Sequence, residues 1–216
     1  MAAGSPSAVA EIASRHGSQV MTQESPLRPG KFPVSLHVVK PGLDNDVLLA
    51  HARAAQHGDD IALGHLVRAT QPTVWRFCNN LSSAQEADDL TQEVFIRAAR
   101  SLGQYRAEAP VISWLLSIAR HVCADQVRRN QRRTRLTHRL RNERYPSTHP
   151  PSALDLTGLV ESLHPDRKLA FVLTQMVGLS YEEAAVVCEC PIGTIRSRVA
   201  RAREDLISAV RQAEAR

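Results

Sequence analysis

The stretch LSYEEAAVVCECPIGTIRSRVARAREDL, residues 179–206, decides how this chain is expected to fold. Ser180 followed three residues later by Glu183 matches a capping box, which predicts that a helix begins there. Gly178 stands where a preceding helix would close. Pro191 suits the first turn of a following helix, where its missing N–H costs nothing. The stretch therefore predicts a helix-turn-helix.

The second helix of this motif divides into two faces when its residues are placed about 100° apart. The apolar stripe that should pack on a core comprises Ile192, Ile195, Val199, Ala202, Leu206, Ala209 and Val210. The opposite face carries small residues edged by arginines, namely Gly193, Thr194, Arg196, Ser197, Arg198, Ala200 and Arg201. Such a face can enter a DNA major groove and read base edges. The alternative is an amphipathic helix whose basic face is only solvated.

Composition favours a helical protein. Hydrophobic residues make up 43% of the 216 residues and aromatics only 4%, which suits helix packing better than a β-sandwich. The net charge of +5 suits a polyanionic partner without identifying it. Four cysteines are too few for a disulfide framework, and C-x-C at 188–190 lacks a second ligand pair, so we expect no metal and no cofactor. No membrane span or secretory signal is recognisable, so we expect a cytoplasmic protein.

The N-terminal part is expected to be a disordered tail over residues 1–43, because it is rich in Ala, Ser, Pro and Gly without sustained periodicity. Helices should begin near residue 44. In a second helix from about Asp60, Pro72 either kinks the helix or sits early in a new segment. Trp75 is expected to be a core residue.

An acidic helix is expected over residues 87–100, with Ser83 and Glu86 as a capping box before it. Leu90, Val94 and Ala98 have the spacing of a buried face. The polar residues left on the other faces are Asp88, Asp89, Gln92 and Glu93. The acids among them are either ordinary residues of a helix N-terminal part, favoured by the helix dipole, or the four residues form a docking surface for another protein.

A further helix is expected over residues 112–130. Its buried face should comprise Leu115, Ile118, Ala119, Val122 and Cys123. Trp114, His121 and Arg128 fall nearly in line on the other side, bordered by Ser117, Arg120 and Asp125. An aromatic ring beside basic groups can stack on an unpaired base while cations hold phosphates. The alternative is that Trp114 is partly core and the other side chains are solvated.

The arginine-rich run that follows, and the prolines after it, indicate an unstructured basic linker over residues 131–153. Beyond it, a short helix over 154–163 and a second helix from Pro165 lead into the helix-turn-helix. We therefore expect an all-α protein with two small helical domains, at 44–130 and 154–216, joined by this flexible linker.

Three of these segments together resemble the extracytoplasmic-function (ECF) sigma factors, the small promoter-recognition subunits of bacterial RNA polymerase, and look most similar to the actinobacterial members. DDLTQEVFIRA at 88–98 resembles region 2.2, and SWLLSIARHVCAD at 113–125 resembles regions 2.3 and 2.4. GLSYEEAAVVCECPIGTIRSRVARARE at 178–204 resembles region 4.2. The resemblance covers the chain from about residue 44 to the C-terminus.

The resemblance implies roles for residues that match the family motifs. The core-docking helix, which contacts the clamp helices of the β′ subunit, corresponds to Asp88, Asp89, Gln92 and Glu93. The residues near the −10 element correspond to Trp114, Arg120, His121, Asp125 and Arg128, with the loop 103–111 helping to form a pocket for a flipped base. The −35 residues correspond to Thr194, Arg196, Ser197, Arg198 and Arg201. Many members have asparagine where this chain has His121.

The resemblance also implies partners and a function. The partners would be core RNA polymerase, through the β′ clamp helices and the β flap, and promoter DNA, with an anti-sigma factor as a further candidate. The chain would direct promoter-specific initiation and would not itself be an enzyme. One rival is a stand-alone helix-turn-helix regulator, which would bind duplex DNA tightly without polymerase. A nuclease is the enzymatic rival, but the sequence offers no clustered acidic metal site or nucleophile triad for it.

Overall fold

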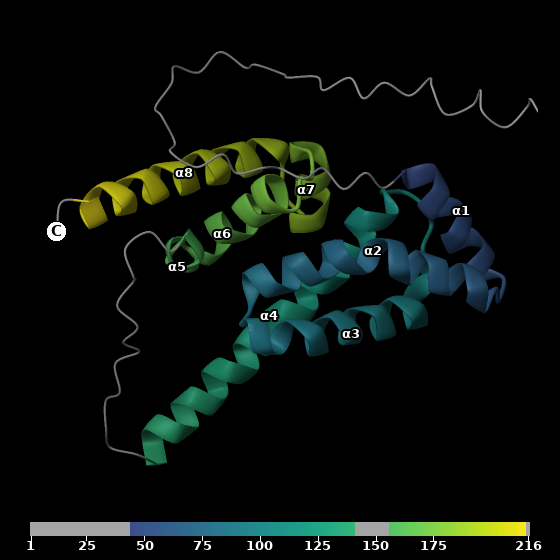
Figure 1. The fold of residues 1–216 in the computed structure, drawn as a ribbon, viewed down its shortest axis with the longest axis horizontal. Helices are drawn as coiled ribbons and strands as arrows, with labels where there is room; N and C mark the ends of the chain where they lie inside the picture. Colours follow the sequence, from purple (N-terminus) through teal and green to yellow (C-terminus); the bar gives the residue numbers. More distant parts are fainter. Residues whose placement is uncertain (1–43, 141–155, 215–216) are drawn as a thin grey trace, which may run out of the picture. The chain divides into compact units, whose positions relative to one another are not determined.

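The computed structural model of the protein describes residues 44–140 and 156–214, and all regular structure within these ranges is helical (Figure 1). The expected all-α fold is therefore confirmed. The N-terminal tail and the proline-containing part of the linker lie outside the described residues. None of the described helices combines the length and hydropathy needed to cross a membrane.

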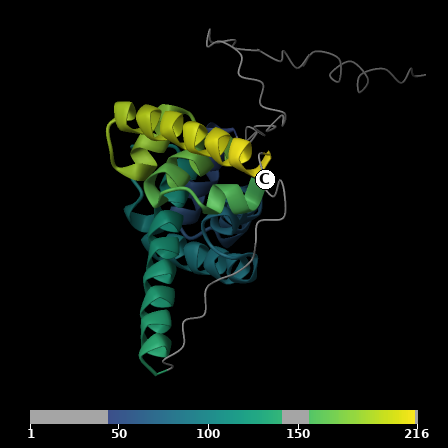
Figure 2. The same ribbon diagram turned by 90° about the vertical axis from the view of Figure 1, so that its left-hand side faces the viewer.

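The first group of helices forms around α2, α3 and α4. Its elements are α1 (Asn45–Gln56), α2 (Asp60–Leu81), α3 (Ala84–Ser101), the 3₁₀ turn η1 (Leu102–Gln104) and α4 (Val111–Leu140). Helices α2 and α3 run side by side, and α4 packs against both (Figures 1 and 2). Phe77, Val94 and Leu115, one from each of these three helices, are at most 1% exposed. The predicted inward face of α3 is confirmed, because Leu90, Val94 and Ala98 are all buried.

Helix α2 differs from the prediction at one position, Trp75. The helix is continuous through Pro72. Its buried face carries Val74 and Phe77, both fully buried. Trp75 follows Val74 by about 100° around the helix axis and is 39% exposed, so the prediction that Trp75 belongs to the core is wrong.

The start of α3 also differs from the prediction. Ser83 occupies the N-cap position but makes no side-chain cap bond; its hydroxyl donates to the Glu86 carboxylate at 3.1 Å. Glu86 instead accepts from Gln126 Nε2 at 2.7 Å and Asn130 Nδ2 at 3.0 Å, both on α4. Hydrogen bonds from Asn130 first, and then from Gln126, hold the pKa of Glu86 below its ordinary value. The predicted capping box is therefore wrong, and Glu86 instead connects α3 to α4 through these hydrogen bonds.

Helix α4 continues to Leu140, so the expectation of an unstructured linker from residue 131 is wrong for residues 131–140. The sequence contains no proline or glycine between Pro110 and Pro146, and arginine has a high intrinsic helix propensity. Nothing in this stretch therefore interrupts the helix, and α4 extends beyond the helices it packs against (Figure 2).

The second group of helices contains the predicted helix-turn-helix. Its elements are α5 (Leu156–Glu161), α6 (Pro165–Phe171), the π-helical turn η2 (Val172–Met176), α7 (Tyr181–Cys188) and α8 (Ile192–Glu214). The capping box is confirmed at the start of α7: Glu183 N–H donates to Ser180 Oγ at 3.1 Å, and Ser180 N–H donates to Glu183 Oε2 at 2.8 Å. Gly178 has φ +88°, as expected of a residue that closes the preceding helix.

Replacing Ser180 with alanine should lower the free energy of unfolding by about 0.5–2 kcal/mol, because the N-cap hydroxyl that satisfies the first turn of α7 is lost. Equilibrium denaturant unfolding would measure the change. Ser208→Ala is a suitable control, since Ser208 is exposed on α8. Equal stability of the two variants would show that this cap contributes little to the helix-turn-helix.

Candidate nucleic-acid interface

Helix α8 presents the two faces that the sequence predicts. Ile195, Val199 and Ala202 lie in the apolar stripe and are at most 1% exposed. The residues exposed on the opposite face are Gly193, Arg196, Ser197, Ala200 and Arg201. No atom lies within 4 Å of the position that a Cβ would take at Gly193. The face around Gly193 is therefore open to a binding partner.

Arg198 does not lie with the exposed arginines. Its Nη2 donates to Asp166 Oδ2 at 2.6 Å, and its Nη1 lies 3.9 Å from Cys190 Sγ. Its side chain is only 26% exposed. Thr194 is half-buried, and its carbonyl accepts the Ser197 hydroxyl at 2.9 Å. Of the five expected −35 residues, the structure thus leaves three open, while Arg198 holds α8 to the start of α6.

The turn between α7 and α8 depends on an uncommon backbone conformation. Glu189 has φ +53°, in the left-handed region that non-glycine residues rarely adopt. Its N–H bonds to carbonyls of the preceding helix, at Ala185 and Val186. Its carboxylate forms an ion pair with Arg120 of α4. Arg120, one of the expected −10 residues, is therefore engaged by an acid in this structure.

The start of α4 is fastened to the loop before it. The rings of Tyr105 and Trp114 have centroids 4.8 Å apart, and the Tyr105 hydroxyl donates to the Ala109 carbonyl at 2.6 Å. Gln56 Nε2 of α1 donates to the carbonyls of Leu102 and Tyr105, both at 2.8 Å. Trp114 is accordingly half-buried. Tyr105 and Gln56, which the sequence did not single out, hold the loop 103–111 in place.

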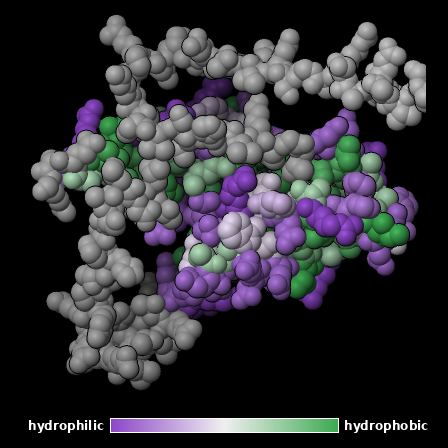
Figure 3. Space-filling model, viewed as in Figure 1, coloured by the Kyte–Doolittle hydropathy of each residue, from purple (hydrophilic) through white to green (hydrophobic). Residues whose placement is uncertain are grey.

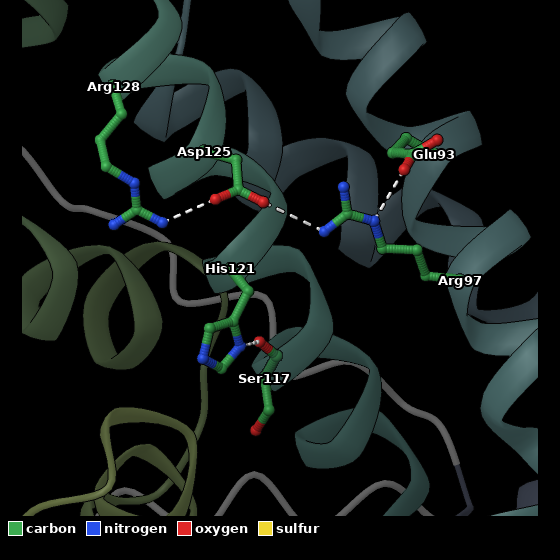
Figure 4. A network of polar contacts seen from close by, with 6 residues as sticks. All are labelled: Glu93, Arg97, Ser117, His121, Asp125 and Arg128. Atoms are coloured by element: carbon green, nitrogen blue, oxygen red, sulfur yellow. Dashed lines mark hydrogen bonds and ion pairs between the residues drawn. The ribbon is translucent and has the colours of Figure 1, made fainter.

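A chain of ion pairs connects α3 to α4 (Figure 4). Arg97 Nε donates to Glu93 Oε1 at 2.7 Å, and Arg97 Nη1 donates to Asp125 Oδ2 at 3.2 Å. Arg128 Nη2 donates to Asp125 Oδ1 at 2.6 Å. The guanidinium of Arg128, and then that of Arg97, hold the pKa of Asp125 below its ordinary value. Glu93 and Asp125, expected in different sites, thus belong to one network.

His121 lies one turn before Asp125 on α4. Its ring is exposed, and its Nδ1 is 2.8 Å from the Ser117 carbonyl (Figure 4). Arg128 is exposed as well. The structure therefore brings His121, Asp125 and Arg128 to one side of α4, as their spacing predicts, and adds Arg97 to them. Arg97 is not among the residues predicted from the sequence, although its i,i+4 spacing from Glu93 indicates an ion pair between the two side chains.

The other three acidic-helix residues form a separate surface. Asp88, Asp89 and Gln92 are exposed on α3, and the molecular face over α3 shows hydrophilic residues with hydrophobic ones between them (Figure 3). Asp88 accepts a hydrogen bond from the Trp75 indole of α2. The expected docking set is thus divided, since Glu93 pairs with Arg97, which in turn bonds to Asp125 of α4, while these three residues face solvent.

Replacing Arg97 with methionine should raise the pKa of Asp125 toward its ordinary value, since one of its two cationic partners is lost. A carboxylate with a lowered pKa stabilises the fold above its unfolded-state pKa, and this contribution is lost as the pH falls through the folded-state pKa. The variant should therefore be less stable than the native chain near pH 7, and the difference should shrink toward about pH 3.

The titration of Asp125 by NMR and thermal unfolding at the two pH values would check this expectation. Arg100→Met is the matched control, because Arg100 is exposed on the same helix. An unchanged Asp125 titration in the Arg97 variant would show that the network does not hold in solution.

Comparison with known proteins places the chain in a family. The family descriptions "Sigma-70 region 2" and "Sigma-70, region 4" match residues 66–133 and 153–206. The chain is 44% identical over 170 residues to the ECF RNA polymerase sigma factor SigC of Mycobacterium tuberculosis, covering 76% of this chain and 92% of that protein. It is 32% identical over 165 residues to the ECF RNA polymerase sigma-E factor of Escherichia coli K12, covering 69% and 86% respectively.

A solved structure agrees with the sequence matches. The complex of the sigma factor RpoE with the anti-sigma factor NepR from Bartonella quintana contains a similar fold, with a TM-score of 0.58 and 29% identity over 68% of this chain and 96% of that one. The chain belongs to the ECF group of the sigma-70 family. It is an RNA polymerase sigma factor that directs promoter-specific initiation, as the sequence predicts, and the stand-alone regulator is not favoured.

Proposed function

We propose that this sigma factor docks on core RNA polymerase through the exposed acidic face of α3 and reads its promoter with α4 and α8. The residues 44–130 would then form the core-binding and −10 module, and 154–216 the −35 module, with 131–153 as the connection. The division of labour rests on separate exposed surfaces: acids on α3, and arginines on α8.

The −35 element would be held by the outward face of α8. Arg196 and Arg201 flank the small Ser197 and all three are exposed, so both guanidinium groups can reach phosphates or base edges in a major groove. Thr194 would contribute at the edge of this surface. Arg198 would act indirectly, because its ion pair with Asp166 fixes the direction of the helix.

The −10 element would be captured by α4 and the loop before it. His121 and Arg128 offer exposed polar groups, and Asp125 is held in place between two arginines. Trp114 would support the pocket for an unstacked base, and Arg120 would bind phosphate after leaving its acid partner. Stacking would return about 1–3 kcal/mol per base of the energy needed to open the duplex.

The remaining parts of the proposal concern chemistry, partners and location. The chain would perform no catalysis, which would belong to the polymerase core, and it would act in the cytoplasm. Core RNA polymerase and promoter DNA would be its partners. An anti-sigma factor would be a third, since a structurally similar sigma factor was solved with the anti-sigma factor NepR.

The observation that carries the proposal is the exposed pair of arginines on the helix face opposite the buried Ile195, Val199 and Ala202. In vitro transcription with the purified chain, purified core polymerase and a promoter library would test it. We expect transcripts from a limited set of start sites that share two upstream boxes. Sequence-specific duplex binding by the chain alone, with no directed transcription, would contradict the proposal.

A further inference from the structure

Trp75 lies on the outer face of α2 and is bonded to one of the proposed docking acids. Its Nε1 donates to Asp88 Oδ1 of α3 at 2.8 Å. The side chain is 39% exposed, and it is one of only two tryptophans in the chain. An exposed indole presents a large apolar surface to water, which solvates it poorly. Together with the exposed acid beside it, this surface is suited to binding a partner.

The hydrogen bond fixes how the acid is presented. Without it, an exposed aspartate would sample several rotamers, and a partner would have to order the side chain on binding. The indole N–H engages Oδ1 only. Among the described residues no hydrogen bond is made to Oδ2, so this part of the chain leaves Oδ2 available to a donor from a partner.

We propose that Trp75 and Asp88 form one composite contact for core RNA polymerase, in which Trp75 is both a positioning residue and a contact residue. The occupant would be a basic side chain of the polymerase, an arginine by preference. Its guanidinium can pair with the free carboxylate oxygen while it lies over the exposed indole ring in a cation–π contact. This inference rests on the proposed docking of α3 on the core enzyme.

The first test measures the affinity of the full-length chain for purified core polymerase. Trp75→Phe keeps an aromatic ring but removes the N–H, and it should weaken core binding about 3- to 10-fold. Asp88→Ala should weaken it at least as much. Ile61→Ala is the control, because Ile61 lies on the same helix and is 73% exposed; it should bind core normally. Circular dichroism would establish that each variant is folded.

A double-mutant cycle separates positioning from simple loss of contact area. If the indole N–H acts by holding Asp88, Trp75→Phe should cost little in a chain that already carries Asp88→Ala. If Trp75→Phe weakened core binding as much in the Asp88→Ala chain as in the native chain, the positioning role would be overturned. Native affinity of Trp75→Phe, with Asp88→Ala weakened, would overturn this inference and leave the docking of α3 standing. Native affinity of Asp88→Ala would instead contradict the docking proposal itself.

Hydroxyl-radical footprinting of the native chain gives an independent readout. Trp75 should be oxidised more slowly once core polymerase is added. Trp114 provides an internal comparison, because it lies at the start of α4 and not on the proposed docking surface of α2 and α3. Equal oxidation of Trp75 in the free and core-bound chain would show that the indole is not covered, and the inference would be wrong.

Discussion

A chain that carries both Asp88→Lys and Asp89→Lys should bind core RNA polymerase at least about 100-fold more weakly than the native chain, because like charges brought together in an interface cost several kcal/mol. Both acids are exposed, so the substitutions should leave the fold intact. Asp88→Lys also removes the carboxylate that accepts the hydrogen bond from the Trp75 indole. Titration of a fluorescently labelled chain with purified core would measure the loss.

The control for this prediction must change the net charge by the same amount elsewhere. Asp46→Lys with Glu108→Lys meets this condition, since Asp46 and Glu108 are exposed outside α3. If the control pair weakened core binding as much as the pair on α3, the effect would come from net charge and not from a specific docking surface. A loss that persists at higher salt would favour direct contact over long-range attraction.

Features with local causes could be predicted from the sequence. The capping box of Ser180 and Glu183 closes within one turn, and the buried stripe of α8 follows from helical spacing alone. Gly178 has the positive φ that its position after a helix requires. Each of these outcomes depends on residues close together in the chain, so no knowledge of the fold was needed.

Features that depend on distant partners could not be predicted. Ser83 and Glu86 have the same spacing as Ser180 and Glu183, but Glu86 bonds to Gln126, forty residues further along the chain. The side chain of Arg198 turns toward Asp166, thirty-two residues before it. In both cases a tertiary partner offered by a neighbouring helix outweighs the local pattern, and the pattern alone does not reveal where that helix lies.

The division of the acidic helix shows the same limit within the site. Helical spacing puts Glu93 about 140° around the axis from Asp88 but only about 40° from Asp89, so spacing alone does not say which of these acids pairs with an arginine. The structure shows that Glu93 faces Arg97 and the network of Asp125 (Figure 4). Core docking and −10 capture are therefore proposed for two faces of one packed pair of helices.

Chains that carry Arg196→Ala or Arg201→Ala should each lose about 10- to 100-fold in transcription from a promoter that depends on its −35 element, which corresponds to the roughly 1–3 kcal/mol of a good arginine–base contact. Both side chains are exposed and make no ion pair within the described part of the chain. Their removal should therefore leave the unfolding temperature and the affinity for core unchanged. Transcription on native and −35-scrambled templates would separate base reading from phosphate binding.

Two further variants of α8 make this prediction specific. Arg211→Ala removes an exposed arginine near the far end of the same helix, about 15 Å from Arg201 along the axis, and should transcribe normally. Arg198→Ala should lower the unfolding temperature, because Asp166 loses its ion-pair partner. If Arg196→Ala or Arg201→Ala lost core binding in a pull-down, the two roles would not be separable in the way proposed. Since α3 and α8 expose different chemistry, acid on one and arginine on the other, the two groups of variants should fail at different steps of initiation.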